Sequence, residues 1–223
     1  VASNWCLAVG TLDTGTTESV AKMWNGTSWV SAGVPPSMRP GLTSDGFEDW
    51  SVQTPDPSGW FRPTGVACEI ANFCIAVGSQ ATGPIIDTFV GGTGWAAYST
   101  ASVVGSFDRT TMRGPPRTQL SGISCSMTIC YATGWDDVVV PNPTNPNFDI
   151  DEYRPVIITR DLTSTWRRIS SDIPTSTLLQ GIACDAIGRC LVTGQHQLPD
   201  KHWTPVAYTM TPNGGSDPAV EPL

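Results

Sequence analysis

Long apolar runs, basic residues and helical periodicity are all scarce in this sequence. No run of about 18 apolar residues occurs, which predicts no membrane insertion by a helix. The chain has 12 Lys and Arg residues against 20 acidic ones, and its formal charge of −8 argues against nucleic acid or an anionic membrane as a partner. No stretch places apolar residues at the spacing of an amphipathic helix, so we expect an all-β fold.

Catalytic signatures are also missing. The sequence contains no Gly-x-Ser-x-Gly elbow, no His-Glu-x-x-His, no phosphate-binding loop and no dinucleotide-binding glycine pattern. Its 2 histidines, His196 and His202, accompany no recognisable nucleophile motif. Acidic residues between 136 and 152 could include a glycosidase carboxylate pair, but the separation in space that defines such a pair cannot be read from the sequence. We therefore expect no catalytic residues.

Glycine, proline and cysteine are plentiful. The 223 residues include 22 Gly, 19 Pro and 7 Cys, and only 14% are charged. This composition suits one domain built from many short strands and tight turns, with a surface rich in small uncharged residues. Paired cysteines with so few charges favour an oxidising compartment, so we predict that the chain is secreted.

One sequence unit recurs along the chain. The clearest copy, 65–78, reads Gly-Val-Ala-Cys-Glu-Ile-Ala-Asn-Phe-Cys-Ile-Ala-Val-Gly, and versions of it return at 122–134 and 181–194. A partial copy at 4–10 reads Asn-Trp-Cys-Leu-Ala-Val-Gly, which would place its first cysteine one position before Val1. Repetition of this kind indicates that one structural unit is copied several times.

Each copy predicts two short strands joined by a turn, with a cysteine on either side of the turn. Residues that flank a hairpin turn face one another, within the Cα separation of about 4.4–6.8 Å that a disulfide needs. The predicted disulfides are Cys68–Cys74, Cys125–Cys130 and Cys184–Cys190. Cys6 is left over: its partner is expected before Val1, outside this chain, and a buried free thiol is the alternative.

A third apolar segment follows each cysteine pair and leads into a turn and a tryptophan. The copies lie at 23–29, 89–95 and 159–166, with a degraded version at 209–215. Asn-Gly and Gly-Gly between apolar runs are strong hairpin signals because tight primed turns require positive φ. Each repeat is therefore predicted to be a four-stranded antiparallel meander.

A four-stranded meander repeated around a ring is a β-propeller, in which each meander is one blade. On the residues above, the chain resembles the secreted, lectin-like propeller repeats common in actinobacterial proteins, with their signature Gly-Val-Ser-Cys…Cys-x-Ala-Val-Gly…Trp-Asn-Gly-Thr-Ser-Trp. The resemblance covers nearly the whole chain and implies a single propeller domain over 1–223, with blades at about 1–32, 64–100, 119–170 and 178–211. The hairpins resemble the sialidase Asp-box more distantly, but no copy has the full Ser-x-Asp-x-Gly-x-x-Trp pattern, so no sialidase residue is carried over.

The predicted blades are incomplete at both ends. The first lacks its inner strand, and the fourth ends after its third strand, with 212–223 expected to be loop. An insertion at 33–63 and a linker at 101–117 separate the first three blades. Because the two deficits do not complement one another, we expect about four blades of a larger ring, or blades whose open edges a protein partner completes or covers. A compact four-bladed domain with imperfect ends is the alternative.

Two segments at equivalent positions of the third and fourth blades combine aromatic and polar side chains. Both follow the second strand of their blade, so we expect them on the same face of the ring. An aromatic ring can cover the apolar face of a sugar while polar groups bind its hydroxyls. The predicted ligand-binding residues are Trp135, Asp136, Asp137 and Tyr153 in a loop over 135–154, and His196, Asp200, His202 and Trp203 in the segment 195–203. Tryptophans that only fill the core are the alternative.

The loop over 135–154 also carries oxygen-bearing side chains at alternate positions. Asn145, Asn147, Asp149 and Asp151 offer the amide and carboxylate oxygens that Ca²⁺ collects, and the last three are candidate calcium ligands. The spacing matches no established calcium loop, so an ordinary polar loop is the alternative. No other cofactor is expected.

These features predict a non-catalytic binding protein outside the cell. Carbohydrate on a cell surface is the expected ligand, bound by the two segments described above. A protein–protein scaffold or adhesive subunit of a larger secreted assembly, such as a toxin complex, is the alternative. A glycoside-processing enzyme is the third possibility considered.

Overall fold

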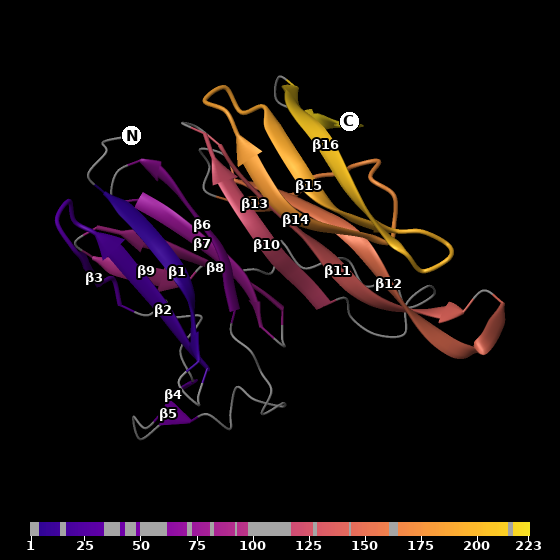
Figure 1. The fold of residues 1–223 in the computed structure, drawn as a ribbon, viewed down its shortest axis with the longest axis horizontal. Helices are drawn as coiled ribbons and strands as arrows, with labels where there is room; N and C mark the ends of the chain where they lie inside the picture. The colour runs from indigo at the N-terminus through magenta and orange to yellow at the C-terminus, as the bar shows by residue number, and fades with distance from the viewer. Residues whose placement is uncertain are drawn as a thin grey trace.

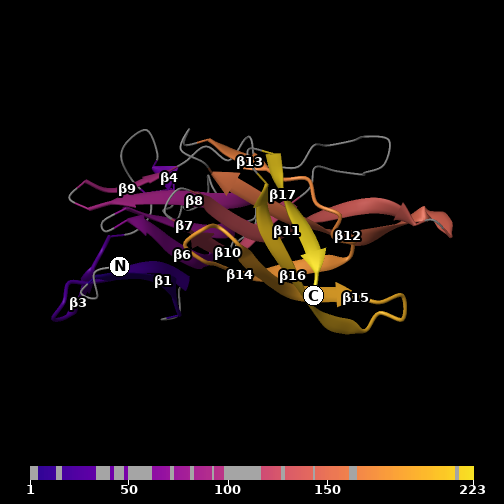
Figure 2. The same ribbon diagram turned by 90° about the horizontal axis from the view of Figure 1, so that it is seen from above.

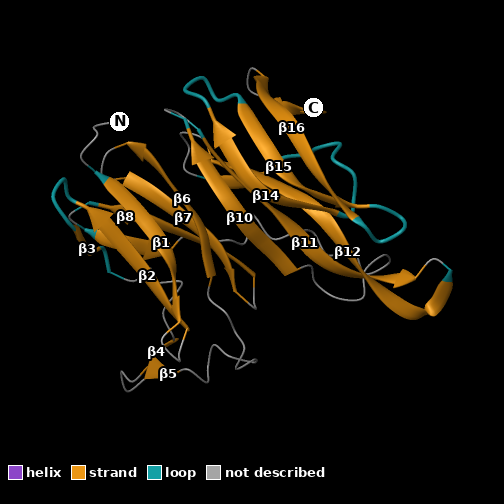
Figure 3. Cartoon of the chain, viewed as in Figure 1, coloured by secondary structure: helices purple, strands orange, loops and turns teal. Residues whose placement is uncertain are grey.

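The computed structural model describes most of the chain as β-strands. The described residues are 5–13, 17–33, 41–42, 48–49, 62–70, 73–80, 83–91, 93–97, 117–126, 129–142, 144–160, 165–213 and 216–223. Within these ranges every regular element is a strand (Figure 3). The same ranges contain no helix that is long and apolar enough to cross a membrane.

Four antiparallel sheets follow one another along the chain (Figure 1). Sheet I consists of β1 (Cys6–Asp13), β2 (Thr17–Trp24) and β3 (Trp29–Ser31). Sheet II consists of β6 (Arg62–Ile70), β7 (Phe73–Gln80), β8 (Gly83–Val90) and β9 (Gly94–Ala97). Sheet III consists of β10 (Arg117–Cys125), β11 (Cys130–Asn142), β12 (Asn145–Arg160) and β13 (Trp166–Arg168). Sheet IV consists of β14 (Thr177–Cys184), β15 (Cys190–Gln197), β16 (Trp203–Asn213) and β17 (Ser216–Pro222).

Neighbouring strands in each of these sheets are also neighbours in sequence, which is the order of a meander. The all-β expectation and the antiparallel meanders are therefore confirmed. A separate small hairpin of β4 (Gly41–Leu42) and β5 (Glu48–Asp49) lies within the predicted insertion at 33–63. The insertion ends earlier than expected, because β6 begins at Arg62. Residues 34–40, 43–47, 50–61 and 98–116 lie outside the described residues.

The expectation that 212–223 is a loop is wrong. Residues 216–222 form β17, which pairs with β16 and gives sheet IV its fourth strand. Pro218 and Pro222 lie in this strand, although proline cannot donate a hydrogen bond to a sheet ladder. Proline is tolerated on an edge strand, and β17 is the outer edge of sheet IV.

The expectation of a swollen loop over 135–154 is also wrong. β11 and β12 continue through this segment as one long hairpin, in which Val138 pairs with Glu152 and Val140 with Ile150. β-Branched valines favour this extended conformation. The turn is tight: the backbone N–H of Thr144 donates to Asn142 Oδ1 at 2.9 Å. The segment therefore extends the sheet beyond its neighbours, toward the right-hand side of Figure 1.

The three predicted disulfides are present. Each bond joins residues that are paired across a hairpin: Cys68–Cys74, Cys125–Cys130 and Cys184–Cys190. Their Cα atoms lie 3.9 to 4.0 Å apart, which is closer than the expected range of about 4.4–6.8 Å. Each closes a loop of only a few residues, so it clips one hairpin and does not connect different sheets. Cys6 is a free thiol and is exposed, not buried.

Each sheet packs against the next one in chain order, so that the sheets form a row (Figure 2). We call the face that meets the following sheet the front face, and the face that meets the preceding sheet the rear face. The front face carries the residue after the second cysteine of each repeat: Leu7, Ile75, Tyr131 and Leu191. The rear face carries that cysteine and the residue two positions later: Cys6 and Ala8, Cys74 and Ala76, Cys130 and Ala132, Cys190 and Val192.

Buried apolar side chains fill the space between successive sheets. Leu7 packs with Phe89 between sheets I and II, Ile75 belongs to a core with the fully buried Trp166 between sheets II and III, and Tyr131 belongs to the core between sheets III and IV. Burial of each such side chain contributes about 1.5–3 kcal/mol. The alternation of the strands therefore supplies both faces of each inner sheet with core residues.

The first glycine of each repeat lets neighbouring sheets approach closely. A Cβ atom on Gly65 would lie 3.3 Å from the Cα of Gly122, and a Cβ atom on Gly122 would lie 3.3 Å from the Cα of Gly181. These three glycines stand on β6, β10 and β14, the first strands of sheets II, III and IV. The repeat therefore needs glycine here because the backbones of successive sheets touch.

A hydroxyl beside this glycine links successive sheets. Thr64 Oγ1 donates to the carbonyl oxygen of Leu120 at 2.7 Å, and Ser121 Oγ donates to that of Leu179 at 2.5 Å. Both bonds join a sheet to the next one at the same position of the repeat. They satisfy carbonyl groups at the bulges where β10 and β14 leave their regular register.

Candidate functional site

The front face of sheet III carries a row of three side chains across its strands. Arg117 on β10 pairs with Asp137 on β11, and Asp137 pairs with Tyr153 on β12. Side chains of directly paired residues share a face, with Cβ atoms about 4.5–5.5 Å apart. Trp135 lies two residues before Asp137 and therefore on the same face. The row lies beyond the core residue Tyr131, toward the extended hairpin.

Tyr153 also contacts the neighbouring repeat. Its ring lies 6.0 Å from that of Trp203, centroid to centroid, with the two planes tilted by 49°. Backbone hydrogen bonds hold the two segments together: Ser176 N–H donates to the Tyr153 carbonyl at 2.5 Å, and Gln197 N–H donates to the Ser176 carbonyl at 2.9 Å. The two predicted segments therefore meet where the middle of β12 passes the end of β15 and the start of β16.

Asp137 is a half-buried carboxylate on the front face of sheet III. Its Oδ1 is buried and has no hydrogen-bond partner among the described residues. Burial raises the pKa of Asp137 above its ordinary value of 3.8, and the nearby negative charge of Asp151 raises it further, while Arg117 lowers it. Burial, followed by the charges of Asp137 and Asp151, also raises the pKa of Tyr153 above 10.0. A perturbed carboxylate of this kind is a candidate functional group.

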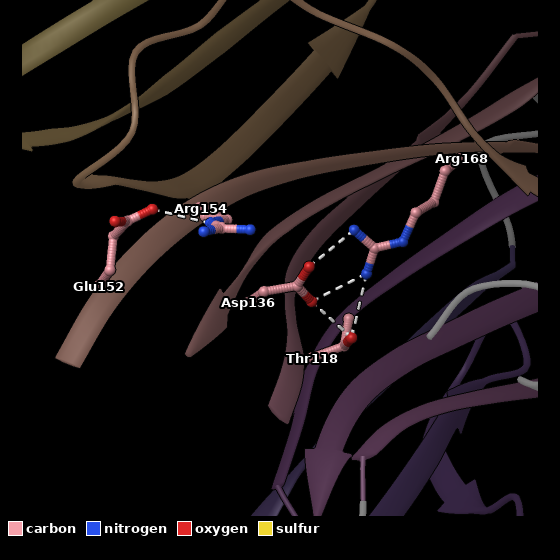
Figure 4. A network of polar contacts seen from close by, with 5 residues as sticks. All are labelled: Thr118, Asp136, Glu152, Arg154 and Arg168. Atoms are coloured by element: carbon pink, nitrogen blue, oxygen red, sulfur yellow. Dashed lines mark hydrogen bonds and ion pairs between the residues drawn. The ribbon is translucent and has the colours of Figure 1, made fainter. Parts of the chain in front are cut away.

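Asp136 has a different environment, on the rear face of sheet III (Figure 4). It is only 5% exposed, and Arg168 binds both of its oxygens at 2.8 Å. Thr118 Oγ1 donates to Asp136 Oδ1 at 2.6 Å, and Arg168 also reaches this hydroxyl at 3.1 Å. Both carboxylate oxygens of Asp136 are thus bound within the structure, and Asp136 stands apart from the other predicted ligand-binding residues of sheet III. Strand alternation separates it from Asp137.

The predicted residues of sheet IV lie at and beside the turn between β15 and β16. His196 Nδ1 lies 3.1 Å from Thr177 Oγ1. The backbone N–H of His202 donates to Asp200 Oδ1 at 3.1 Å, and both side chains are exposed in the turn. Trp203 follows them at the start of β16 and is 36% exposed. Trp203 contacts the front face of sheet III through the ring of Tyr153.

The candidate calcium ligands lie on a strand. Residues 145–151 belong to β12, and backbone positions two residues apart on a strand are separated by about 6.8 Å, so the strand does not wrap around one ion as a calcium loop does. Asp149 and Asp151 are exposed, whereas the side chain of Asn147 lies outside the described part of the structure. Among the residues described, no group of three or more His, Cys, Asp and Glu side chains is placed to hold a metal ion.

Two arginines contribute in ways that the sequence did not reveal. Arg117, expected to end a linker, is the first residue of β10 and lies beside Asp137. Arg168, on the short edge strand β13, fixes Asp136. The alternation of β11 with its neighbours could have separated Asp136 from Asp137, but no local signal connects Arg168 with Asp136.

The chain matches no protein-family model, and no curated protein sequence matches it. The candidate site is therefore defined by the side chains of this chain alone. It consists of Arg117, Asp137, Asp151, Tyr153 and Trp203, and we call it the Tyr153–Trp203 site. Together they offer two aromatic rings, two carboxylates and one guanidinium at one edge of the molecule.

Proposed function

We propose that the chain is a secreted, non-catalytic carbohydrate-binding protein whose four sheets are blades of a β-propeller. The observation that carries the carbohydrate proposal is the contact between Tyr153 and Trp203, which joins aromatic side chains of two repeats beside acidic groups. Front-to-rear packing of repeated meanders supports the propeller. Three disulfides support export to an oxidising compartment.

The chemistry of the Tyr153–Trp203 site suits a sugar. A pyranose ring has a face of C–H groups that packs on an aromatic ring, and Trp203 offers such a ring at 36% exposure. Tyr153 supports this ring from the neighbouring sheet. Asp137 and Asp151 would accept hydrogen bonds from sugar hydroxyls. One such hydroxyl would donate to Asp137 Oδ1, which has no partner among the described residues. Arg117 would donate to a hydroxyl or to an acidic sugar.

A glycan array with the purified, oxidised chain tests this proposal. Binding is expected to at least one class of glycan, and the Trp203→Ala variant is expected to bind on the order of tenfold more weakly or worse, because the stacking surface is lost. Phe148→Ala is the matched control, since Phe148 is an aromatic residue that is 64% exposed, lies on the β11–β12 hairpin that also carries Tyr153, and lies outside the site. Titration calorimetry on the best glycan measures the difference.

Two outcomes would contradict the proposal. Absence of binding across the array, with or without added calcium, would remove carbohydrate as the ligand class. Binding that Trp203→Ala and Tyr153→Ala leave unchanged, but that Phe148→Ala weakens, would place the sugar at the hairpin tip instead. A near-ultraviolet circular dichroism spectrum of each variant shows whether its tertiary packing is retained.

Glycoside hydrolysis is a second candidate, and one observation favours it. The raised pKa of Asp137, next to the second carboxylate Asp151, is the arrangement from which a glycosidase takes its general acid. Release of reducing sugar from the bound glycan, abolished by Asp137→Asn, would support an enzyme. Binding without any such release supports the non-catalytic role.

A further inference from the structure

The front face of sheet IV is exposed at a position where the other sheets are buried. Leu191 is 43% exposed, whereas its counterparts in the preceding repeats, Leu7, Ile75 and Tyr131, are 9%, 0% and 2% exposed. Each counterpart is covered by the rear face of the next sheet. Thr193, two residues further on the same face, is exposed as well, and its counterpart Thr133 is fully buried. The front face of sheet IV therefore has the form of a sheet-to-sheet contact without its partner.

The rear face of sheet I is also exposed at a position where the rear faces of the other sheets are buried. Ala8 is exposed, and its counterparts Ala76, Ala132 and Val192 are all 0% exposed because each lies against the front face of the preceding sheet. Trp29 belongs to this face, since it pairs with Trp24, which pairs with Cys6. These two exposed faces are the two halves of the contact that the chain already forms between its own sheets.

Trp29 occupies a repeat position at which the tryptophans of sheets II and III pack against the preceding sheet. It is 53% exposed, whereas its counterpart Trp166 in sheet III is fully buried. Its counterpart in sheet II, Trp95, packs toward sheet I and donates its indole N–H to the carbonyl oxygen of Ala32 at 2.8 Å. Exposed tryptophans of this kind are common centres of binding energy in interfaces.

Sheet IV carries the matching acceptor. Ala32 follows the outer strand of sheet I, and its N–H donates to the carbonyl of Ala21 on the neighbouring strand at 3.0 Å. Leu223 follows the outer strand of sheet IV, and its N–H donates to the carbonyl of Ala207 at 3.0 Å in the same manner. Leu223 is therefore the counterpart of Ala32, and its main-chain oxygen lies where an incoming Trp29 indole would donate. The side chain of Leu223 is 78% exposed.

We propose that the front face of sheet IV binds the rear face of sheet I in a second copy of this chain. Sheets I and IV are the first and the last sheet of the packed series (Figures 1 and 2), and within one chain the two faces stay exposed instead of covering one another. The exposed Lys22 on the rear face of sheet I and the exposed Glu221 on the front face of sheet IV carry opposite charges. The contact is heterologous, so copies associate head to tail, closing into a ring or extending as a chain.

Sedimentation velocity of the whole oxidised chain tests the contact, and non-reducing electrophoresis of the same sample shows whether the exposed Cys6 has joined copies by a disulfide. The unmodified faces are expected to associate between low and high micromolar concentrations. Leu191→Glu and Ala8→Glu should each abolish extended association, and each should raise the dissociation constant on the order of 30-fold or more, because a charge would be buried in an apolar contact. Ile187→Glu is the control, since Ile187 is 69% exposed in the turn between β14 and β15.

Mixing the two defective variants separates head-to-tail contact from other arrangements. The Leu191→Glu chain keeps an intact sheet I face, and the Ala8→Glu chain keeps an intact sheet IV face. An equimolar mixture should therefore form a dimer that cannot extend, although each variant alone is monomeric. Trp29→Ala in the Leu191→Glu chain should weaken this dimer.

Three outcomes would overturn the proposal. The first is a chain that stays monomeric at high micromolar concentration. The second is loss of association in Leu191→Glu but not in Ala8→Glu, which indicates that sheet IV faces meet one another. The third is a monomeric mixture of the two variants although the parent chain associates. Glycan binding by monomeric variants is measured separately, so failure of this contact does not bear on the Tyr153–Trp203 site.

Discussion

Gly134 on β11 lies directly against the backbone of Gln119 on β10. A Cβ atom at this position would overlap the Gln119 carbonyl oxygen and would lie 2.9 Å from the Cα of Leu120. The overlap arises at the bulge between Leu120 and Gly122, where β10 bends toward its partner. Gly194 has the same relationship to the backbone of Leu178 in sheet IV. The last glycine of the repeat is thus required by a bulge in the preceding strand.

Substitution of the last glycine of the repeat should be severely destabilising only in a sheet with a strand paired before it, such as β10 beside β11. Gly134→Ala is expected to lower the free energy of unfolding by at least about 3 kcal/mol, because backbone and not a flexible side chain must move. Gly10 is the matched control: it holds the same repeat position in sheet I, and a Cβ atom there meets nothing within 4 Å. Urea denaturation should show Gly10→Ala within about 1 kcal/mol of the parent chain. Equal effects at the two positions would contradict the role of the bulge.

Asp136 should matter for stability more than for ligand binding. Asp136→Asn removes the carboxylate charge that Arg168 binds at 2.8 Å in a largely buried network, so a loss of about 3 kcal/mol in the free energy of unfolding is expected. Glu152→Gln is the control, because the Glu152–Arg154 pair is 26% and 34% exposed and should contribute at most about 1 kcal/mol. Thermal unfolding measures both. A glycan affinity that falls in Asp136→Asn while stability is unchanged would assign Asp136 to the site after all.

Asp137 should make stability depend on pH. Its pKa is raised in the folded chain, so the folded state holds the proton more tightly than the unfolded state does. Stability from this group is therefore present below the ordinary value of 3.8 and is lost as pH rises through the folded pKa. Asp137→Asn should match the parent chain at strongly acidic pH and exceed it in stability near neutral pH. Denaturation across a pH series measures this, and a difference that grows toward acidic pH would contradict the assignment.

Each disulfide should stabilise its hairpin by a modest amount. Loss of the Cys125–Cys130 bond in a Cys125→Ser, Cys130→Ser double variant is expected to cost about 2–3 kcal/mol, because the closed loop is short. Cys6→Ser is the control, since Cys6 is an exposed free thiol, and it should leave stability unchanged. The measurement is urea denaturation without reductant. Equal free energies of unfolding for the double variant and the parent chain would show that the Cys125–Cys130 disulfide does not stabilise its hairpin.

Tyr153 and Trp203 should be energetically coupled before any ligand binds. Their tilted contact across two sheets predicts a coupling free energy of about 0.5–1.5 kcal/mol in a double-mutant cycle of Tyr153→Ala and Trp203→Ala. Trp24 and Trp29, 5.8 Å apart within sheet I, provide a comparison pair that lies within a single repeat. Additive effects at Tyr153 and Trp203 would mean that the two segments do not support one another in solution.

Local features of the repeat were readable from the sequence, and features that depend on distant residues were not. Cysteines on either side of a short turn predicted the disulfides because hairpin geometry places flanking residues opposite one another. The hairpin over 135–154 was missed although Val138, Val139 and Val140 are strong strand formers, and β17 was missed because its prolines are acceptable only at an edge. Local propensity does not say whether a strand has an edge to occupy.

The candidate site divides along the same line. Two aromatic and acidic segments at equivalent repeat positions were expected on the same face of the ring, and the contact between Tyr153 and Trp203 was not predicted. Strand alternation turned Asp136 to the rear face of sheet III and left Asp137 at the front. Periodicity and cysteine spacing in the sequence therefore determined the repeated antiparallel hairpins. Only the packing of one sheet on the next decided which side chains stay accessible, because exposure depends on the surface that another repeat covers, and that surface is contributed by residues far away in the chain.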